Sequence, residues 1–328
     1  MKHQIMLLSV LLLGCPAEEN QPKLDGGFYV EPIDAGPPPI KYTQFTARVN
    51  GWPSGAPVRG IALLDTTLYA ATDYGLYGLP TSSATWQRET LPLPTGEQPS
   101  SIQRIGDTLV MTTASDTSGG VWTRQSDTAW TRVASAPAAP TWKLFSKSAD
   151  YFLVTTGGLY AASDYEGDWA ARSDAGLFDE AVRLIVAAPA QQKMFAARNG
   201  LWESVDNGST WRTFDAGANT GTLTGLAANG AFVLVATDDG TQVRSINYGN
   251  TFSPQPTGLD AGVSFYLWQS PRFWAGNAEG LWASDDDGVT FAAQGAGLPS
   301  ETPVTGLFFS GSYVVADTVD GPYITQQP

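Results

Sequence analysis

The sequence predicts an all-β fold, a seven-bladed β-propeller with four antiparallel strands in each blade, and three observations lead to it. The composition is typical of strands joined by tight turns, since 35 glycines, 22 prolines, 11 tryptophans and 12 tyrosines accompany only 15% charged residues. From residue 41 onward the chain repeats with a pitch of about 41 residues. Each complete repeat holds four strand-like segments, which is the content of a propeller blade.

Every repeat has the same order of segments. An apolar strand precedes a second strand that ends in small residues, and a glycine, an aromatic strand and a polar hairpin follow. The glycines before the third strands are Gly75, Gly120, Gly158, Gly200, Gly240, Gly280 and Gly321. The aromatic residues that close the hairpins are Trp86, Trp130, Trp169, Trp211, Phe252 and Phe291, and we expect these rings to pack between adjacent sheets.

The ring is expected to close through the N-terminal part of the propeller. The seventh repeat, 304–328, contains only three strand segments, whereas residues 42–49 resemble an outermost strand that has no blade of its own. We therefore expect this N-terminal strand to complete the last blade, because that closure leaves no strand edge exposed at the seam. Rings of six or eight blades are the alternatives.

The first 14 residues are interpreted as a lipoprotein signal peptide. An apolar run from Ile5 to Leu13 is too short to span a bilayer as a helix and fits a secretory signal. The segment Leu12–Cys15, with the sequence LLGC, resembles a bacterial lipobox, and the resemblance implies that Cys15 is lipidated and becomes the new N-terminus. An ordinary signal peptide, cut after a small residue, is the alternative.

Residues 15–40 are predicted to connect this anchor to the propeller, which spans residues 41–328. The segment is rich in proline, glycine and acidic residues and shows neither a strand nor a helix period, so we expect a flexible tether. Pro16 follows Cys15 where a retention signal would have aspartate. By resemblance to known sorting rules, the anchor is then expected in the outer membrane of the cell envelope.

The signal peptide and the anchor also restrict the chemistry. Cys15 is the only cysteine and His3 the only histidine. The mature chain would therefore lack a Ser-His-Asp triad, a Cys-His pair and a zinc site of imidazole or thiolate ligands. We expect no cofactor and no metal.

The net charge limits the partners. It is −14 at pH 7, so nucleic acid is not expected as a partner, because phosphate binding needs clustered lysine and arginine. The anionic surface of a membrane is disfavoured for the same reason.

An acidic motif recurs in the hairpins between the third and fourth strands. The three clearest copies, which we call the repeat hairpins, are 204–211 (SVDNGSTW), 245–252 (SINYGNTF) and 284–291 (SDDDGVTF). They resemble the Asp-box (BNR) repeat, Ser-x-Asp-x-Gly-x-Thr-Trp. The matching residues are Ser204, Asp206, Gly208, Thr210 and Trp211, then Ser245, Asn247, Gly249 and Thr251, and then Ser284, Asp286, Gly288 and Thr290. We expect these residues to stabilise a turn, and a calcium loop is the less favoured interpretation.

Two groups of charged residues are candidates for ligand binding on the other face of the ring. The turns between second and third strands carry Asp73, Asp116, Asp238, Asp239, Glu279 and Asp320, which would attract a cation or a basic partner. The first strands bring the basic residues Arg59, Arg104, Lys143 and Arg183 near the axis, and of these we select Arg59 and Arg183 for the possible ligand face. The simpler interpretation is that tight turns use aspartate and that the basic residues are structural.

The expected function is a binding or assembly scaffold for a protein or a glycan, and we expect a monomer. The alternative comes from the Asp-box resemblance, which implies a sialidase-like glycoside hydrolase with three arginines, a Tyr–Glu pair and an aspartic acid. No pair of carboxylates can be assigned to that chemistry here. For a glycan ligand, the tryptophans that fit the repeat least are candidates for stacking on sugar rings: Trp52, Trp142, Trp268 and Trp274.

Overall fold

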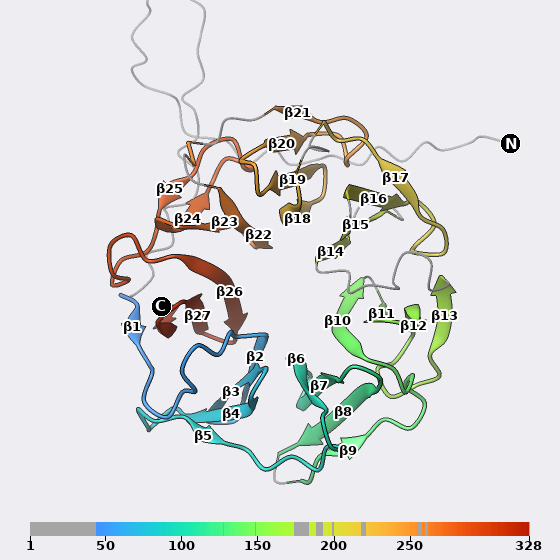
Figure 1. Cartoon of the computed structure of the whole chain (residues 1–328), viewed down its shortest axis with the longest axis vertical. Coiled ribbons are helices and arrows are strands. Elements are labelled where there is room, and N and C mark those ends of the chain that lie inside the picture. The colour runs from blue at the N-terminus through green and yellow to red at the C-terminus, as the bar shows by residue number, and fades with distance from the viewer. Residues whose placement is uncertain are drawn as a thin grey trace, which may run out of the picture. The chain divides into compact units, whose positions relative to one another are not determined.

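The computed structural model describes residues 44–126, 128–147, 149–173, 184–187, 193–198, 200–217, 221–254, 258–259 and 262–327. In these ranges the regular elements are 28 strands, which form seven four-stranded antiparallel sheets. The sheets stand around a common axis as the blades of a propeller (Figure 1). The predicted all-β, seven-bladed fold is confirmed, and its compact unit is Lys41–Pro328.

The strands follow one another from the axis outward in each blade. Blade 1 holds β2 (Gly60–Leu64), β3 (Thr67–Thr72), β4 (Gly75–Pro80) and β5 (Gln87–Arg88). Blade 2 holds β6 (Gln98–Ile105), β7 (Thr108–Ala114), β8 (Gly119–Gln125) and β9 (Thr131–Arg132). Blade 3 holds β10 (Thr141–Lys147), β11 (Asp150–Thr155), β12 (Gly158–Ala162) and β13 (Ala170–Ser173). Blade 4 holds β14 (Leu184–Ala187), β15 (Met194–Arg198), β16 (Gly200–Ser204) and β17 (Arg212–Phe214).

The remaining blades repeat this order. Blade 5 holds β18 (Leu223–Asn229), β19 (Phe232–Thr237), β20 (Gln242–Ser245) and β21 (Ser253–Pro254). Blade 6 holds β22 (Val263–Gln269), β23 (Arg272–Asn277), β24 (Gly280–Ser284) and β25 (Ala292–Ala293). Blade 7 holds β26 (Val304–Ser310), β27 (Tyr313–Thr318) and β28 (Gly321–Gln326), and its outermost strand is β1 (Thr46–Ala47).

The outer strand of blade 7 comes from the N-terminal side of the propeller. Thr46 pairs with Ile324, and Ala47 pairs with Tyr323. The following residues continue into blade 1, where the indole Nε1 of Trp86 donates a hydrogen bond of 2.7 Å to the carbonyl of Arg48. The short strand β1 thus links the two blades that the chain reaches first and last.

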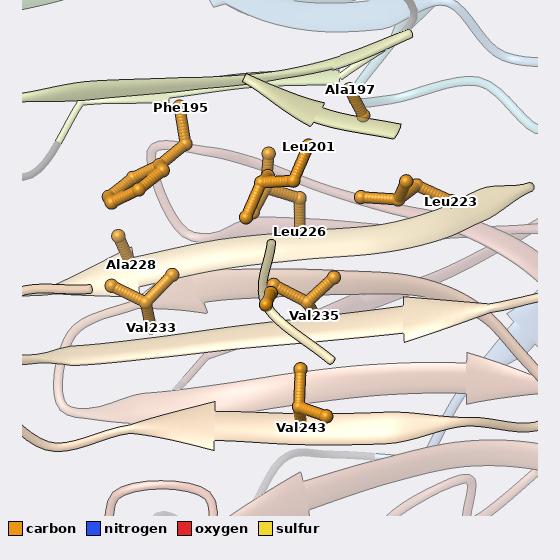
Figure 2. Packing of buried hydrophobic residues seen from close by; sticks show 10 residues of the cluster. Phe195, Ala197, Leu201, Leu223, Leu226, Ala228, Val233, Val235 and Val243 are labelled. Carbon is orange, nitrogen blue, oxygen red and sulfur yellow. The ribbon is translucent and has the colours of Figure 1, made fainter. Parts of the chain in front are cut away.

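The hydrophobic core is divided into seven clusters, one between each pair of neighbouring blades. Figure 2 shows the cluster between blades 4 and 5, in which Phe195 and Leu201 of one sheet face Leu226 and Val233 of the next. The second strands supply much of this core: every residue of β7 and β23 is buried. Burial on both faces explains why these strands contain runs of apolar or small residues, Leu109–Ala114 and Phe273–Gly276, rather than an alternating pattern.

The aromatic residues that close the hairpins occupy equivalent places. Each packs in the cluster that its blade shares with the preceding blade, as Trp130 does between blades 1 and 2 and Phe291 between blades 5 and 6. Trp86, Trp169, Trp211 and Phe252 do the same in their blades. The expected packing between sheets is therefore present, and each ring lies on the side of the preceding blade around the propeller.

Candidate functional site

The face of the ring that carries the repeat hairpins is called the hairpin face, and the opposite face the upper face. Antiparallel pairing puts the third-to-fourth hairpins at the same end as the first-to-second turns, and both belong to the hairpin face. The turns between second and third strands, and the links to the next blade, belong to the upper face.

The acidic residue of each repeat hairpin is used inside its own turn. Asp206 accepts hydrogen bonds from the Thr210 amide (2.8 Å) and hydroxyl (2.6 Å) and from the Ser204 hydroxyl (2.8 Å). The Ser204 hydroxyl oxygen in turn accepts a hydrogen bond from the amide of Gly208 at 2.8 Å. Asn207 and Gly208 both have positive φ, +59° and +85°, so two consecutive left-handed residues form the turn.

The other two copies keep this network. Asp286 accepts the same three bonds from Thr290 and Ser284. Asn247 replaces aspartate, and its amide group donates a hydrogen bond of 2.9 Å to the Thr251 hydroxyl. A neutral side chain therefore satisfies the same turn, so the motif does not require the charge of the carboxylate.

The carboxylates of the repeat hairpins respond to this environment. Burial raises the pKa of Asp206, but the hydrogen bonds from Thr210 and Ser204 outweigh it, and the pKa lies below its usual value. Asp286 behaves in the same way, with Thr290 and Ser284 as donors. Oxygens held in this way by their own turn are poor calcium ligands. Among the described residues, no group of three or more histidine, cysteine, aspartate or glutamate side chains is arranged to hold a metal ion.

Each repeat hairpin also docks on the preceding blade. A Cβ added to Gly208 would lie 2.5 Å from Leu159 Cδ2 of blade 3. Gly249 lies in the same way against Phe195 of blade 4, and Gly288 against Leu234 of blade 5. An apolar side chain of the neighbouring sheet thus occupies the space that a side chain on the motif glycine would need.

Basic residues of the preceding blade reinforce this docking. Lys147 of blade 3 donates a hydrogen bond of 2.9 Å to the Asn207 side chain of blade 4. Lys193 of blade 4 donates to the Asn250 side chain (2.5 Å) and to the Tyr248 carbonyl (3.2 Å) of blade 5. The repeat hairpins therefore hold neighbouring blades together, and their oxygen atoms have structural partners.

The acidic residues of the predicted ligand face lie on the upper face and are distributed around the ring. They occupy turns of blades 1, 2, 5, 6 and 7, and all six side chains are exposed: Asp73, Asp116, Asp238, Asp239, Glu279 and Asp320. Asp238 accepts a hydrogen bond from the backbone amide of Thr222, just before the first strand of the same blade, and Asp239 accepts one from the amide of Thr241 in its own turn. The six carboxylates thus give the upper face an acidic rim, not a single pocket.

The basic residues of the first strands do not form one site. Arg59 makes a bidentate ion pair with Asp73 on the upper face, at 2.8 and 2.7 Å. Arg104 lies at the hairpin-face end of its strand and donates to the Gly106 carbonyl and to Asp107. Arg183 lies outside the described residues, as does Cys15. In the part of the chain that the structure describes, no three arginines converge.

One site at the seam between blades 7 and 1 was not recognised from the sequence. The side chain of Asp317 is only 4% exposed, and its Oδ2 accepts a hydrogen bond of 3.0 Å from the Thr305 hydroxyl. Its Oδ1 is buried and has no hydrogen-bond partner among the described residues. Burial raises the pKa of Asp317 to about 6, although Thr305, the Val58 amide and the charge of Arg59 all act in the opposite direction.

The tryptophans that were candidates for sugar stacking differ in exposure. Trp274 is 1% exposed and lies in the core between blades 6 and 7, so this prediction was wrong: β23 is a second strand, and both of its faces are covered. Trp52 is half-buried and packs against Trp86 and Tyr77. Trp142 and Trp268 are also half-buried.

Two hollows stand out on the surface of the propeller. A cavity of about 440 Å³ lies on the hairpin face and is lined by the inner strands of blades 7, 1 and 2. A second cavity, of about 370 Å³, lies on the upper face where blade 1 leads into blade 2, and it is lined by Arg88, Glu89, Leu91 and Glu97, among others. Among the described residues, no helix is long and apolar enough to cross a membrane.

Comparison with known proteins identifies the architecture but no family. No family model matches the chain, and no curated protein matches it in sequence. Among solved structures, YCF48 bound to D1 peptide is 14% identical, with a TM-score of 0.65 over 88% of this chain and 98% of that one. YCF48 from Cyanidioschyzon merolae is also 14% identical, with a TM-score of 0.58 over 84% of this chain and 97% of that one.

Propellers of other kinds are similarly close. The extracellular domain of a protein described as a hybrid two component system from B. thetaiotaomicron is 11% identical, with a TM-score of 0.63 over 88% of this chain and 42% of that one. An ancestral GH74 enzyme is 12% identical, with a TM-score of 0.62 over 84% of this chain and 48% of that one. Likeness at these identities establishes the fold alone, because one propeller fold hosts many functions.

Proposed function

We propose that this chain is a cell-envelope lipoprotein whose propeller binds a protein partner with a basic surface through its upper face. The observation that carries the proposal is the acidic rim: exposed carboxylates lie on the upper face in five of the seven blades. Carboxylates spread over a face attract an oppositely charged surface and speed its encounter.

The structural neighbours support a binding role without assigning a partner. One of them, YCF48, was solved with a bound peptide, and another is the extracellular domain of a protein described as a hybrid two component system. The GH74 enzyme keeps the glycoside hydrolase alternative open as an activity to assay. The pairing of Arg59 disfavours a sialidase-like site. Its guanidinium already binds Asp73, whereas the arginines of such a site bind the carboxylate of the substrate.

The anchor and the repeat family belong to the same proposal. We assign the repeat hairpins to the Asp-box class because all three copies share one hydrogen-bond network around a Ser, an Asp or Asn, and a Thr. We further propose that Cys15 carries the lipid, that residues 15–40 tether the propeller, and that the outer membrane is the destination.

Replacing Cys15 with serine is expected to move the protein from the membrane fraction to the soluble fraction, because a serine hydroxyl does not replace the thiol that receives the lipid. Fractionation and incorporation of labelled fatty acid would measure both parts of this prediction. The matched control is Ser9→Ala, which changes the apolar run but leaves Cys15 in place. Retention of the Cys15→Ser chain in membranes, with no label, would rule out lipid anchoring through this residue.

Neutralising part of the acidic rim is expected to weaken the binding of a basic partner. The variant combines Asp116→Asn, Glu279→Gln and Asp320→Asn, three exposed residues whose carboxylates make no hydrogen bond within the described part of the chain. Binding of an oligolysine peptide should become about tenfold weaker, on the basis of several tenths of a kcal/mol for each exposed charge, and raised salt should remove the difference.

The matched control carries the same loss of charge on the hairpin face: Glu166→Gln, Asp168→Asn and Asp287→Asn. Titration calorimetry at low and high salt would compare the two triple variants. If both lose affinity equally, only the net charge of the protein matters, and the upper face is not a specific binding surface.

A further inference from the structure

The cavity of about 440 Å³ on the hairpin face is lined by both polar and apolar side chains. Ile61 and Leu63 of β2 and Phe309 of β26 line it. Phe309 packs against the buried Trp274, with ring centroids 5.9 Å apart, and Leu63 lies over the turn at Gly311. Gly311 has a φ of +57°, and a Cβ there would lie 2.9 Å from Leu63 Cδ2, so both walls are held by close packing.

Hydrogen-bond donors line the same cavity. They are the side chains of Gln103 and Arg104 on β6 and of Ser310 on β26. The Ser310 oxygen accepts a hydrogen bond from the Leu63 amide at 2.7 Å, which leaves its hydroxyl hydrogen available. Within the described part of the chain, no hydrogen bond engages the Gln103 amide or Nη1 of Arg104.

The charge of the cavity differs from that of the rest of the protein. None of the described residues that line it is acidic, and Arg104 brings a guanidinium group, although the protein as a whole carries a net charge of −14. Asp107, which pairs with Arg104 at 2.7 Å, is 94% exposed and lies beside the cavity. Such an exposed pair is weak, and it leaves the guanidinium able to bind a second acceptor.

We propose that this cavity binds a carboxylate joined to an apolar body, such as an N-acylated aromatic amino acid or the C-terminal residue of a peptide. Its volume lies in the range of small-molecule sites, which combine apolar walls with a few polar groups. The carboxylate accepts from Arg104, Gln103 and Ser310, while the apolar body covers the half-buried Leu63 and Phe309. The site lies on the hairpin face, so it is separate from the acidic rim of the proposed function.

Calorimetric titration of the full chain with N-acetyl-phenylalanine and with its amide tests this inference. The acid should bind at least tenfold more tightly than the amide, because a charge-assisted hydrogen bond contributes more than a neutral one. A pentapeptide with C-terminal phenylalanine, compared with the acetylated amino acid, distinguishes the source: tighter binding of the peptide indicates a chain terminus, and equal binding indicates a free acid.

Arg104→Gln should reduce the affinity for the acid about tenfold and leave that for the amide unchanged. Arg172→Gln removes the same charge from the exposed outer strand of blade 3 and should leave both affinities unchanged. Absence of binding at millimolar acid, equal binding of acid and amide, or equal effects of the two arginine variants would each overturn the proposal. None of these results bears on oligolysine binding at the acidic rim, so the two proposals fail independently.

Discussion

Replacing Gly249 with alanine is expected to destabilise the propeller by about 2 to 5 kcal/mol. The residue has a φ of +72°, and holding alanine in a left-handed conformation costs about 1 to 2 kcal/mol. The new methyl group would also enter the ring of Phe195, which is fully buried and closely packed between blades 4 and 5. Overpacking of this kind adds about 1 to 3 kcal/mol.

Gly240→Ala is the matched control for the cost of holding alanine in a left-handed backbone conformation. Gly240 lies in the same blade with a φ of +86°, and a Cβ there would meet no atom within 4 Å. This variant should lose only about 1 to 2 kcal/mol. Gly288→Ala should fall between the two, because its added methyl would meet the flexible end of Leu234, at 2.7 Å, and not a ring.

Urea unfolding of the three variants and the wild type would measure these differences, with tryptophan fluorescence as the signal. The difference between Gly249→Ala and Gly240→Ala isolates the contact between blades. If the two variants are equally stable, the repeat hairpin does not transmit strain to Phe195, and its role as a lock between blades is refuted.

The repeat positions explain why so much of the fold could be predicted from sequence. The glycine before each third strand allows a tight turn, and the aromatic residue after each hairpin fills the space between two sheets. Both requirements are local and recur from blade to blade. Gly240 and Phe252 therefore mark their blade without knowledge of the rest of the chain. The strand Thr46–Ala47 could be assigned because the last repeat lacks its fourth strand.

The repeat pattern could not predict contacts between residues that do not recur from blade to blade. Asp317 meets Val58 and the charge of Arg59 only because the ring brings its last blade against its first. The burial of Trp274 was missed because an irregular position in the repeat does not indicate exposure. The cavity beside Leu63 likewise combines three blades whose side chains differ from one another. Its donors follow no motif, so no pattern in the sequence could have predicted it.

Asp317→Asn is expected to change how the stability of the propeller depends on pH. Burial raises the pKa of Asp317 from its ordinary value of 3.8 to about 6 in the folded state. The folded protein then keeps a proton that the unfolded chain releases between these values. The stabilisation from this proton is fully present below about pH 4 and is lost as the pH rises through 6, and a shift of this size corresponds to about 3 kcal/mol.

Asparagine stays neutral over the whole pH range, so the variant does not lose stability as the pH rises through 6. Relative to the wild type, Asp317→Asn should gain up to about 3 kcal/mol in unfolding free energy between pH 4 and pH 7. The measurement is the difference between the two proteins at each pH, since contributions of other groups, such as the lowered pKa values of Asp206 and Asp286, cancel in it. Asp320→Asn, on the exposed surface of the same blade, controls for the loss of one charge.

Arg59→Gln gives the opposite test of the same site. The charge of Arg59 lowers the pKa of Asp317, although its guanidinium is bound to Asp73, so removing it should raise that pKa further and shift the pH at which stability is lost upward. The shift must disappear when Asp317→Asn is combined with Arg59→Gln, because the titrating group is then absent. A shift that persists in the double variant would mean that the pH dependence comes from another carboxylate and that the buried Asp317 is neutral throughout. The pair of variants therefore distinguishes titration of the Asp317 carboxyl between blades 7 and 1 from a general effect of surface charge.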